Sequence, residues 1–157
     1  MKEQEIARKM TMAWSIAFEG SISMAKVKRP LLKGPQYYPR ISLDNTDKSL
    51  LAGWVLLVGY GNVYHHRRYS SAWKDLYQWA ITSQKDIKKF LEDIIPFLPA
   101  KQMLAGLMLN FINRRLDKGW VGMGMNRKLH HVSFGDADEQ VYQQMKILNQ
   151  RGKGVKK

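Results

Sequence analysis

The sequence contains no cysteine, which excludes disulfide bonds, cysteine zinc sites and thiol catalysis together. It also lacks a long apolar run: the longest, residues 50–60, is too short to cross a bilayer, which needs roughly 20 residues. The first five residues are polar and acidic, unlike a signal peptide. We therefore expect a soluble intracellular protein without a membrane partner, in the cytoplasm, the nucleoid or an organelle.

Acidic residues are scarce, since 13 Asp and Glu stand against 26 Lys and Arg, and the formal net charge is +13. So large a positive charge favours a polyanionic partner. Aromatic side chains are interleaved with the basic ones, a pattern that favours nucleic acid. The alternatives are a basic protein with a solvated cationic surface and a ribosome-associated protein.

Hydrophobic periodicity predicts the order helix, hairpin, helix, hairpin, helices. Helices are expected at 6–18, at 47–58 behind the capping side chains of residues 44–47, at 100–116 and at 136–150, and the hairpins at 21–43 and 62–81. A further helix, capped by Ser83 or Thr82, would carry the apolar stripe Ile87, Phe90, Leu91 and Ile94. Trp73 and Met103 are expected in the core. Two antiparallel hairpins with helices on one face make an α+β layer arrangement. At 157 residues we expect one domain over residues 1–150, followed by a basic, disordered tail at 151–157.

The other face of the predicted sheet is polar and basic. A bulge or a strong local twist near Met24 would keep Lys26 and Lys28 on the same face as the serines before them. Such a ribbon suits the major groove of DNA, which admits two-stranded ribbons. The candidate DNA contacts are Ser21, Ser23, Lys26, Lys28, Arg29, Arg40, Ser42, His66, Arg67, Arg68, Lys74 and Gln78.

Two histidines near the tip of the second hairpin suggest a different nuclease site. His65 and His66 could belong to a His-Asn-His or His-Cys site, but the Asp, Asn and Cys framework of such sites is absent around them. Because Arg67 and Arg68 are adjacent, phosphate contact is a better interpretation of these histidines than a nuclease site. Solvated loop residues are an equally good alternative.

Glu19 is an acid at the end of an apolar helix, where Gly20 is the expected stop. The C-terminus of a helix carries partial negative charge, which disfavours an acid there. Metal binding is the obvious reason to keep one. One turn apart on the same helix, Ala13 and Ala17 would let another backbone approach closely. Their alternative role is ordinary packing against the chain's own sheet.

Residues 12–20 resemble the signature of the LAGLIDADG homing endonucleases, and Glu19-Gly20-Ser21-Ile22 resembles its frequent ending. Two further segments, 45–48 (Asn-Thr-Asp-Lys) and 96–102 (Pro-Phe-Leu-Pro-Ala-Lys-Gln), resemble landmarks of that family in the same order. The resemblance implies an αββαββα fold with a saddle-shaped antiparallel sheet and helices on one face, to which this chain adds a C-terminal helix.

The resemblance also implies an activity: sequence-specific, Mg²⁺-dependent cleavage of double-stranded DNA by an intron-encoded enzyme. Single-motif members act as homodimers, so Ala13, Trp14 and Ala17 would lie at a two-fold interface and the target would be nearly palindromic. Trp14 departs from the glycine that the family prefers, and Ala17 replaces the first acid of the signature. The alternatives with the same fold are an RNA maturase and a catalytically silent DNA-binding protein.

By the same resemblance, Glu19 and Gly20 would hold the divalent cation together with the second copy. Asn45 would help to order the attacking water, and Lys101 would lie near the scissile phosphate. For both residues a structural role is the alternative: Asn45 as a helix cap, and Lys101 as a surface lysine near a helix start.

Overall fold

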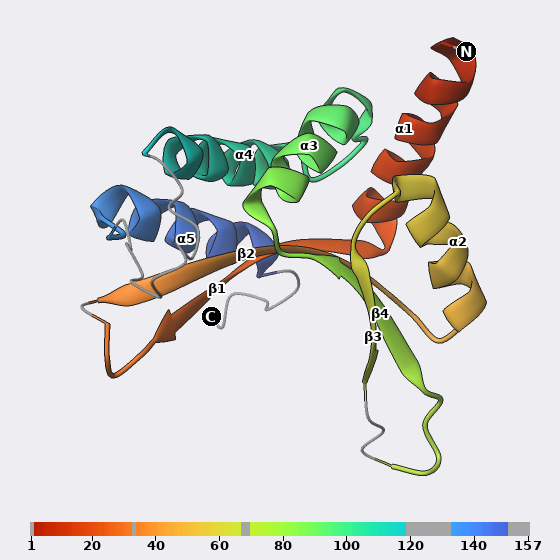
Figure 1. Ribbon diagram of the computed structural model, residues 1–157, viewed down its shortest axis with the longest axis horizontal. Coiled ribbons are helices and arrows are strands. Elements are labelled where there is room, and N and C mark those ends of the chain that lie inside the picture. Colours follow the sequence, from red (N-terminus) through yellow and green to blue (C-terminus); the bar gives the residue numbers. More distant parts are fainter. Residues whose placement is uncertain (1, 33, 67–69, 119–132, 151–157) are drawn as a thin grey trace, which may run out of the picture.

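The computed structural model describes residues 2–32, 34–66, 70–118 and 133–150 (Figure 1). The predicted αββαββα order with an additional C-terminal helix is confirmed. The expected disordered tail and the segment from 119 to 132 lie outside the described residues. The elements are α1 (Lys2–Phe18), β1 (Gly20–Lys28), β2 (Pro35–Asn45), α2 (Lys48–Val58), β3 (Asn62–His66), β4 (Leu76–Ile81), α3 (Gln84–Ile94), the 3₁₀ turn η1 (Ile95–Phe97), α4 (Gln102–Asp117) and α5 (Asp136–Asn149).

The strands form one antiparallel sheet in the order β1-β2-β4-β3, so the two hairpins join through β2 and β4. Figure 1 shows the hairpins extending in different directions, which gives the sheet a strong curvature, with α3, α4 and α5 on one side. The predicted antiparallel sheet with helices on one face is confirmed.

The β1–β2 hairpin is regular along its whole length. Its pairs run without interruption from Gly20 opposite Leu43 to Lys28 opposite Pro35. The bulge that the sequence predicts near Met24 is absent, and that prediction is wrong. Because side chains alternate strictly in an unbroken strand, Lys26 and Lys28 fall on the helix side.

A carboxylate on α5 explains why a lysine is tolerated on the helix side. Glu139 accepts hydrogen bonds from the Tyr37 hydroxyl and, at 2.7 Å, from Gln143 Nε2, and its carboxylate lies 2.7 Å from Lys26 Nζ. The Lys26 ammonium also lies 5.6 Å from the centre of the Tyr142 ring. These contacts attach α5 to the β1–β2 hairpin.

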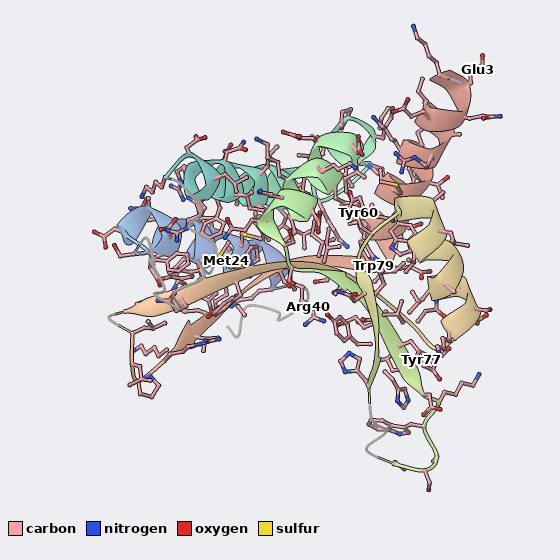
Figure 2. All side chains as sticks on the ribbon, viewed as in Figure 1. Glu3, Met24, Arg40, Tyr60, Tyr77 and Trp79 are labelled. Atoms are coloured by element: carbon pink, nitrogen blue, oxygen red, sulfur yellow. The ribbon has the colours of Figure 1, made fainter. Side chains whose placement is uncertain are left out.

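Trp79 of β4 is the largest fully buried side chain among the described residues (Figure 2). Its ring centre lies 5.4 Å from that of Trp54 and 5.6 Å from that of Phe90. Its Nε1 donates to the carbonyl oxygen of Tyr60 at 3.0 Å. A Cβ on Gly61, whose φ is 97°, would lie 2.3 Å from the same nitrogen, so only glycine fits before β3.

The predicted apolar stripe of α3 is confirmed, since Ile87, Phe90, Leu91 and Ile94 are all buried.

Among the described residues, no helix is both long and apolar enough to cross a membrane. The prediction for Met103 is wrong, because its side chain is 68% exposed on α4.

Trp73 is a second core prediction that fails. Its side chain is 61% exposed. The strand that the sequence placed around it begins only at Leu76, so Trp73 belongs to the connection before β4. Strand parity therefore does not apply to it.

Acid should weaken the attachment of α5. The bonds from Lys26 and Tyr37 lower the pKa of Glu139 from 4.5 to about 2, so its stabilisation is complete above about pH 4.5 and is lost as the pH falls towards 2. At about pH 6, Glu139→Gln should melt at a lower temperature than the wild type. Its melting temperature should fall less than that of the wild type when the pH is lowered to about 3. Circular dichroism melts at both pH values measure this.

Glu92→Gln is the matched control, since Glu92 is an exposed carboxylate on α3. It should follow the wild type at both pH values. Equal acid sensitivity of Glu139→Gln and the wild type would contradict the role given to this carboxylate.

Candidate nucleic-acid interface

The turn from α1 into β1 carries Glu19. The Glu19 amide donates to the Ser15 carbonyl at 2.9 Å, so the last helical turn continues up to the strand, and the Glu19 side chain is exposed. Gly20 then packs directly on α1: a Cβ there would lie 2.7 Å from Ile16 Cα. Gly20 is not among the residues with positive φ, so close approach, and not a left-handed helix cap, requires glycine here.

Lys101 supports this turn from the start of α4. Its Nζ donates to the carbonyl oxygens of Ile16, at 2.8 Å, and of Gly20, at 2.5 Å. A cation at the negative end of α1 offsets the electrostatic cost of Glu19 there. Lys101 itself has a φ of 65°, an unfavourable conformation for a residue with a side chain. Through these two bonds Lys101 positions the turn that carries Glu19. Its predicted role near the scissile phosphate stays a prediction.

Asn45, the last residue of β2, closes the turn into α2. Its Oδ1 accepts a hydrogen bond from the Asp47 amide at 2.8 Å, and Asp47 Oδ1 accepts from the Ser49 amide at 2.8 Å as the cap of α2. Asp47, not Asn45, is therefore the cap itself. The proposed role of Asn45 in ordering water stays a prediction.

The open face of the sheet lies opposite the helices. Cross-strand pairing places Ser21 opposite Ser42, and Ser23 opposite Arg40. Figure 2 shows Arg40 projecting from the side away from the helices. Gln78 shares this face through its pairs across β2 and β3. These five predicted residues therefore lie on one surface, although Ser42 is only 5% exposed.

Two more candidates reach the open face in other ways. His66 lies in β3 opposite Leu76, and not at the hairpin tip. Arg29 follows β1, and its guanidinium lies 5.5 Å from the ring centre of Tyr38, which is on the open face. Arg67 and Arg68 are outside the described residues.

Three predicted lysine contacts need correction. Lys26 and Lys28 lie on the helix side because the register is unbroken, and Lys26 is paired with Glu139. Lys74 is exposed, but it precedes β4, so it does not belong to the row of Gln78.

The sequence did not identify Asp44 and Tyr64 as members of this surface. Both stand opposite Gln78, on either side of β4. Gln78 Nε2 donates to Asp44 Oδ1 at 2.5 Å, and Arg40 Nη2 donates to Gln78 Oε1. For Asp44 the missing signal is the length of β2, which continues to Asn45 past the predicted end at Leu43. For Tyr64 it is the register of β3 against β4, since the connection between these strands is long.

Solved structures resemble this chain closely in fold. The homing endonuclease I-CvuI, in complex with a DNA target, matches with a TM-score of 0.69 at 17% identity over 96% of this chain and 87% of its own. An archaeal intron-encoded homing endonuclease complexed with DNA matches with a TM-score of 0.68 at 13% identity, over 97% and 88%. The LAGLIDADG meganuclease I-CpaMI, bound to uncleaved DNA, matches with a TM-score of 0.60 at 16% identity, over 90% and 49%.

The chain has the LAGLIDADG fold. The resemblance stated from the sequence is thus confirmed in the fold. No protein-family model and no curated protein sequence matches the chain.

In this LAGLIDADG fold, the two small residues of α1 face the chain's own core. Ala13 is fully buried and Ala17 is 3% exposed in a single chain. The prediction that they form a close contact between two copies is wrong, because neither is accessible to a partner.

A different face of α1 is exposed and apolar. Ile6, Met10, Trp14 and Phe18 recur every four residues and are 43–66% exposed, and we call them the α1 stripe. The rings of Trp14 and Phe18 lie 5.5 Å apart. Trp14 therefore remains a candidate for the interface, together with the other large apolar side chains of the α1 stripe.

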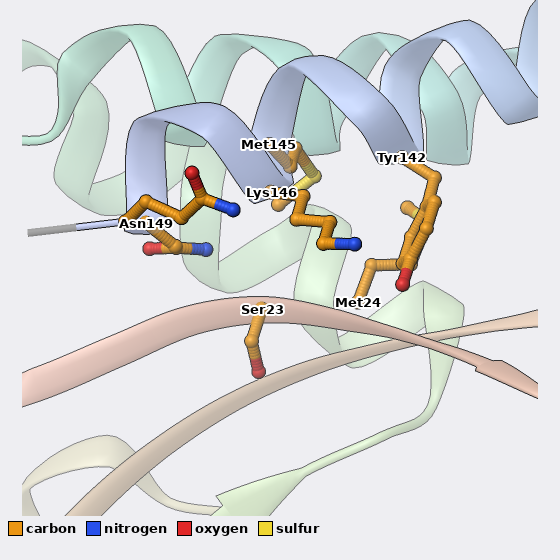
Figure 3. A pocket seen from close by; sticks show the side chains of 7 residues that line it. Ser23, Met24, Tyr142, Met145, Lys146 and Asn149 are labelled. Atoms are coloured by element: carbon orange, nitrogen blue, oxygen red, sulfur yellow. The ribbon is translucent and has the colours of Figure 1, made fainter. Parts of the chain in front are cut away.

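The LAGLIDADG fold also leaves a pocket of about 320 Å³ between the edge strand β1 and α5 (Figure 3). The described residues that line it include no carboxylate and no imidazole, which makes it a poor metal site. The lining residues are Ser23, Met24, Tyr142, Met145, Lys146, Asn149 and Gln150.

A methionine at position 101 tests the support of the Glu19 turn. Lys101→Met removes the charged donor of two hydrogen bonds and should lower the free energy of unfolding by about 2 kcal/mol. Lys101→Gly loses the same bonds but relieves the positive φ, so it should be more stable than Lys101→Met by up to about 1 kcal/mol. Urea unfolding measures both differences.

Lys85→Met, at an exposed position on α3, is the control and should unfold like the wild type. If Lys101→Met is as stable as this control, the bonds to α1 and β1 contribute nothing.

Proposed function

We propose that two copies of this chain form a sequence-specific endonuclease that cuts double-stranded DNA at a nearly palindromic site, with Mg²⁺ as cofactor. The observation that carries the proposal is an exposed acid, Glu19, on a LAGLIDADG fold whose open sheet face is rich in hydrogen-bonding side chains. The structures of similar fold include homing endonucleases in complex with DNA, two of them determined in the presence of Mg or Ca.

DNA binding would use the open face. A curved antiparallel sheet can follow the major groove, where hydrogen-bonding side chains such as Ser21, Arg40 and Gln78 read base edges. The net charge of +13 supplies the attraction to phosphates that does not depend on sequence.

The second copy would cover the α1 stripe. Exposed apolar surface of this kind, with two aromatic side chains, is typical of an interface. A two-fold contact through Trp14 and Phe18 would bring two copies of Glu19 near the axis, because Glu19 directly follows the stripe. The chain also covers only 49% of I-CpaMI, which leaves room there for a second unit of similar size.

The residues present fit a shared divalent cation better than one held by a single chain. Among the described residues, no three His, Cys, Asp or Glu side chains are close enough together to hold a metal. Each chain offers the Glu19 carboxylate and the Gly20 carbonyl, and Lys101 already donates to the latter. A bound Mg²⁺ would supply an activated water and charge compensation at the leaving oxygen.

The chain's own residues would act mainly by position. Gly20 and Lys101 hold the turn, so that the Glu19 carboxylate points outward at a defined place. Two such carboxylates repel one another until a cation lies between them, which favours metal binding over an empty dimer.

Loss of the acid should abolish cleavage and preserve binding. Glu19→Gln should cut at least about 100-fold more slowly, with DNA affinity changed by less than about threefold. The substrate is DNA that spans the insertion site of the protein's own coding sequence, with the insert removed, in the presence and absence of Mg²⁺. Glu92→Gln, which changes an exposed carboxylate on α3, should cut like the wild type.

The outcomes separate the competing functions. Tight DNA binding without cleavage by the wild type would indicate a catalytically silent DNA-binding protein. Preference for the intron RNA over this DNA would indicate a maturase. Cleavage by Glu19→Gln at the wild-type rate would show that the metal assignment is wrong.

A charge in the α1 stripe should separate the copies. Trp14→Glu would bury an unpaired carboxylate at the interface, so dimer affinity should fall at least about 100-fold while the monomer stays folded, because Trp14 is 49% exposed in one chain. Sedimentation velocity measures the oligomeric state. Leu31→Glu, which changes a 97% exposed residue in the β1–β2 connection, should remain dimeric. A dimeric Trp14→Glu would place the interface elsewhere.

A further inference from the structure

An acid on the open face is unexpected for a surface that is to face DNA. Asp44 is exposed on the row of β2 that also carries Ser42 and Arg40. A carboxylate there repels phosphate, so its retention needs a reason other than affinity. The hydrogen bond from Gln78 Nε2, at 2.5 Å, provides one.

This bond fixes the orientation of the Gln78 amide. Its nitrogen faces the Asp44 carboxylate, and its oxygen accepts from Arg40 Nη2. The opposite orientation would set two acceptors together at Asp44 and two donors together at Arg40. By fixing the Gln78 amide, Asp44 therefore ensures that the Arg40 guanidinium faces the amide oxygen and not the amide nitrogen.

Arg40 is held on a second side by an aromatic ring. Its guanidinium lies 6.0 Å from the ring centre of Tyr64, on the neighbouring strand β3. Its Nε is buried and has no hydrogen-bond partner in the part of the chain that the structure describes, so contacts to a ligand fall to the two terminal nitrogens. Those nitrogens keep free N–H groups beyond the one that Gln78 uses.

An arginine held in one orientation is suited to a guanine. Two N–H groups of a guanidinium match O6 and N7 of guanine in the major groove. Gln78 already uses one amide N–H and one lone pair of its oxygen in these bonds, which restricts how its amide can turn towards an adenine. The network thus favours the contact from Arg40 to guanine over a contact from Gln78 to adenine.

We propose that Arg40 reads a guanine at two symmetry-related positions of the target, and that Asp44 is the positioning residue that maintains this choice through Gln78. The inference rests on the proposed binding of DNA by the open face, but it does not depend on cleavage.

The test selects bound sequences from a randomised double-stranded DNA library with full-length protein, without divalent metal. The wild type should enrich a motif containing a guanine whose preference disappears in Arg40→Ala. At that position, the ratio of dissociation constants for other bases over guanine should be roughly 5- to 150-fold in the wild type and should fall below about twofold in Arg40→Ala.

Two changes at Asp44 then separate charge from orientation. Asp44→Asn removes the charge but keeps an oxygen that can accept from Gln78, so the guanine preference should stay within about twofold of the wild type. Asp44→Ala removes both, and the preference should fall at least about threefold. Both variants should bind random DNA more tightly, by a similar factor, because each removes one negative charge.

Glu92→Ala, on the exposed side of α3, is the matched change of charge and should leave the base preference as it is. Circular dichroism melts confirm that each variant is folded, and Asp44→Asn keeps the size of the side chain. Equal guanine preference in Asp44→Ala and the wild type, or a motif with no Arg40-dependent guanine, would overturn the inference and leave DNA binding intact. A wild type that enriches no sequence would contradict both this inference and the proposed function.

Discussion

The end of α1 packs directly against the start of β1, and this junction fixes how the chain enters the sheet. Gly20 lies so close to Ile16 that no side chain fits, and the Lys101 ammonium binds carbonyl oxygens of both residues. The helix therefore continues into the sheet with a defined angle. This junction presents Glu19 outward and starts the β1–β2 register that sorts the two faces of the sheet.

Local signals predicted the elements well, because periodicity and capping act over a few residues. The apolar stripe of α3 and the caps Asp47 and Ser83 are examples. Long-range contacts account for the failures. Lys26 is a charged residue on the helix side of β1, and the partner that makes this possible, Glu139, comes from the last helix. Ala13 fits an interface between copies as well as a core, and only the packing of α1 decides between them.

The candidate site was predictable only in part for the same reason. Glu19 stood out because an acid at that helix end is unfavourable in a single chain. Asn45 and Lys101 were found by resemblance, yet their contacts to neighbouring backbone need coordinates. Asp44 escaped notice because β2 continues past the predicted end of the strand at Leu43, and Tyr64 because the register of β3 against β4 brings it to Gln78. The large side chains of the α1 stripe, in place of small ones, also change the interface expected between copies.

If Glu19 works as a pair at a two-fold axis, the two copies of this residue must lie close together in the dimer. The chain has no cysteine, so Glu19→Cys accepts one spin label per copy. Leu31→Cys, at the far end of the β1–β2 hairpin, gives the comparison. Pulsed electron paramagnetic resonance on the dimer should give a much shorter distance between labels at 19 than at 31. A longer distance at 19, or no coupling, would contradict the account.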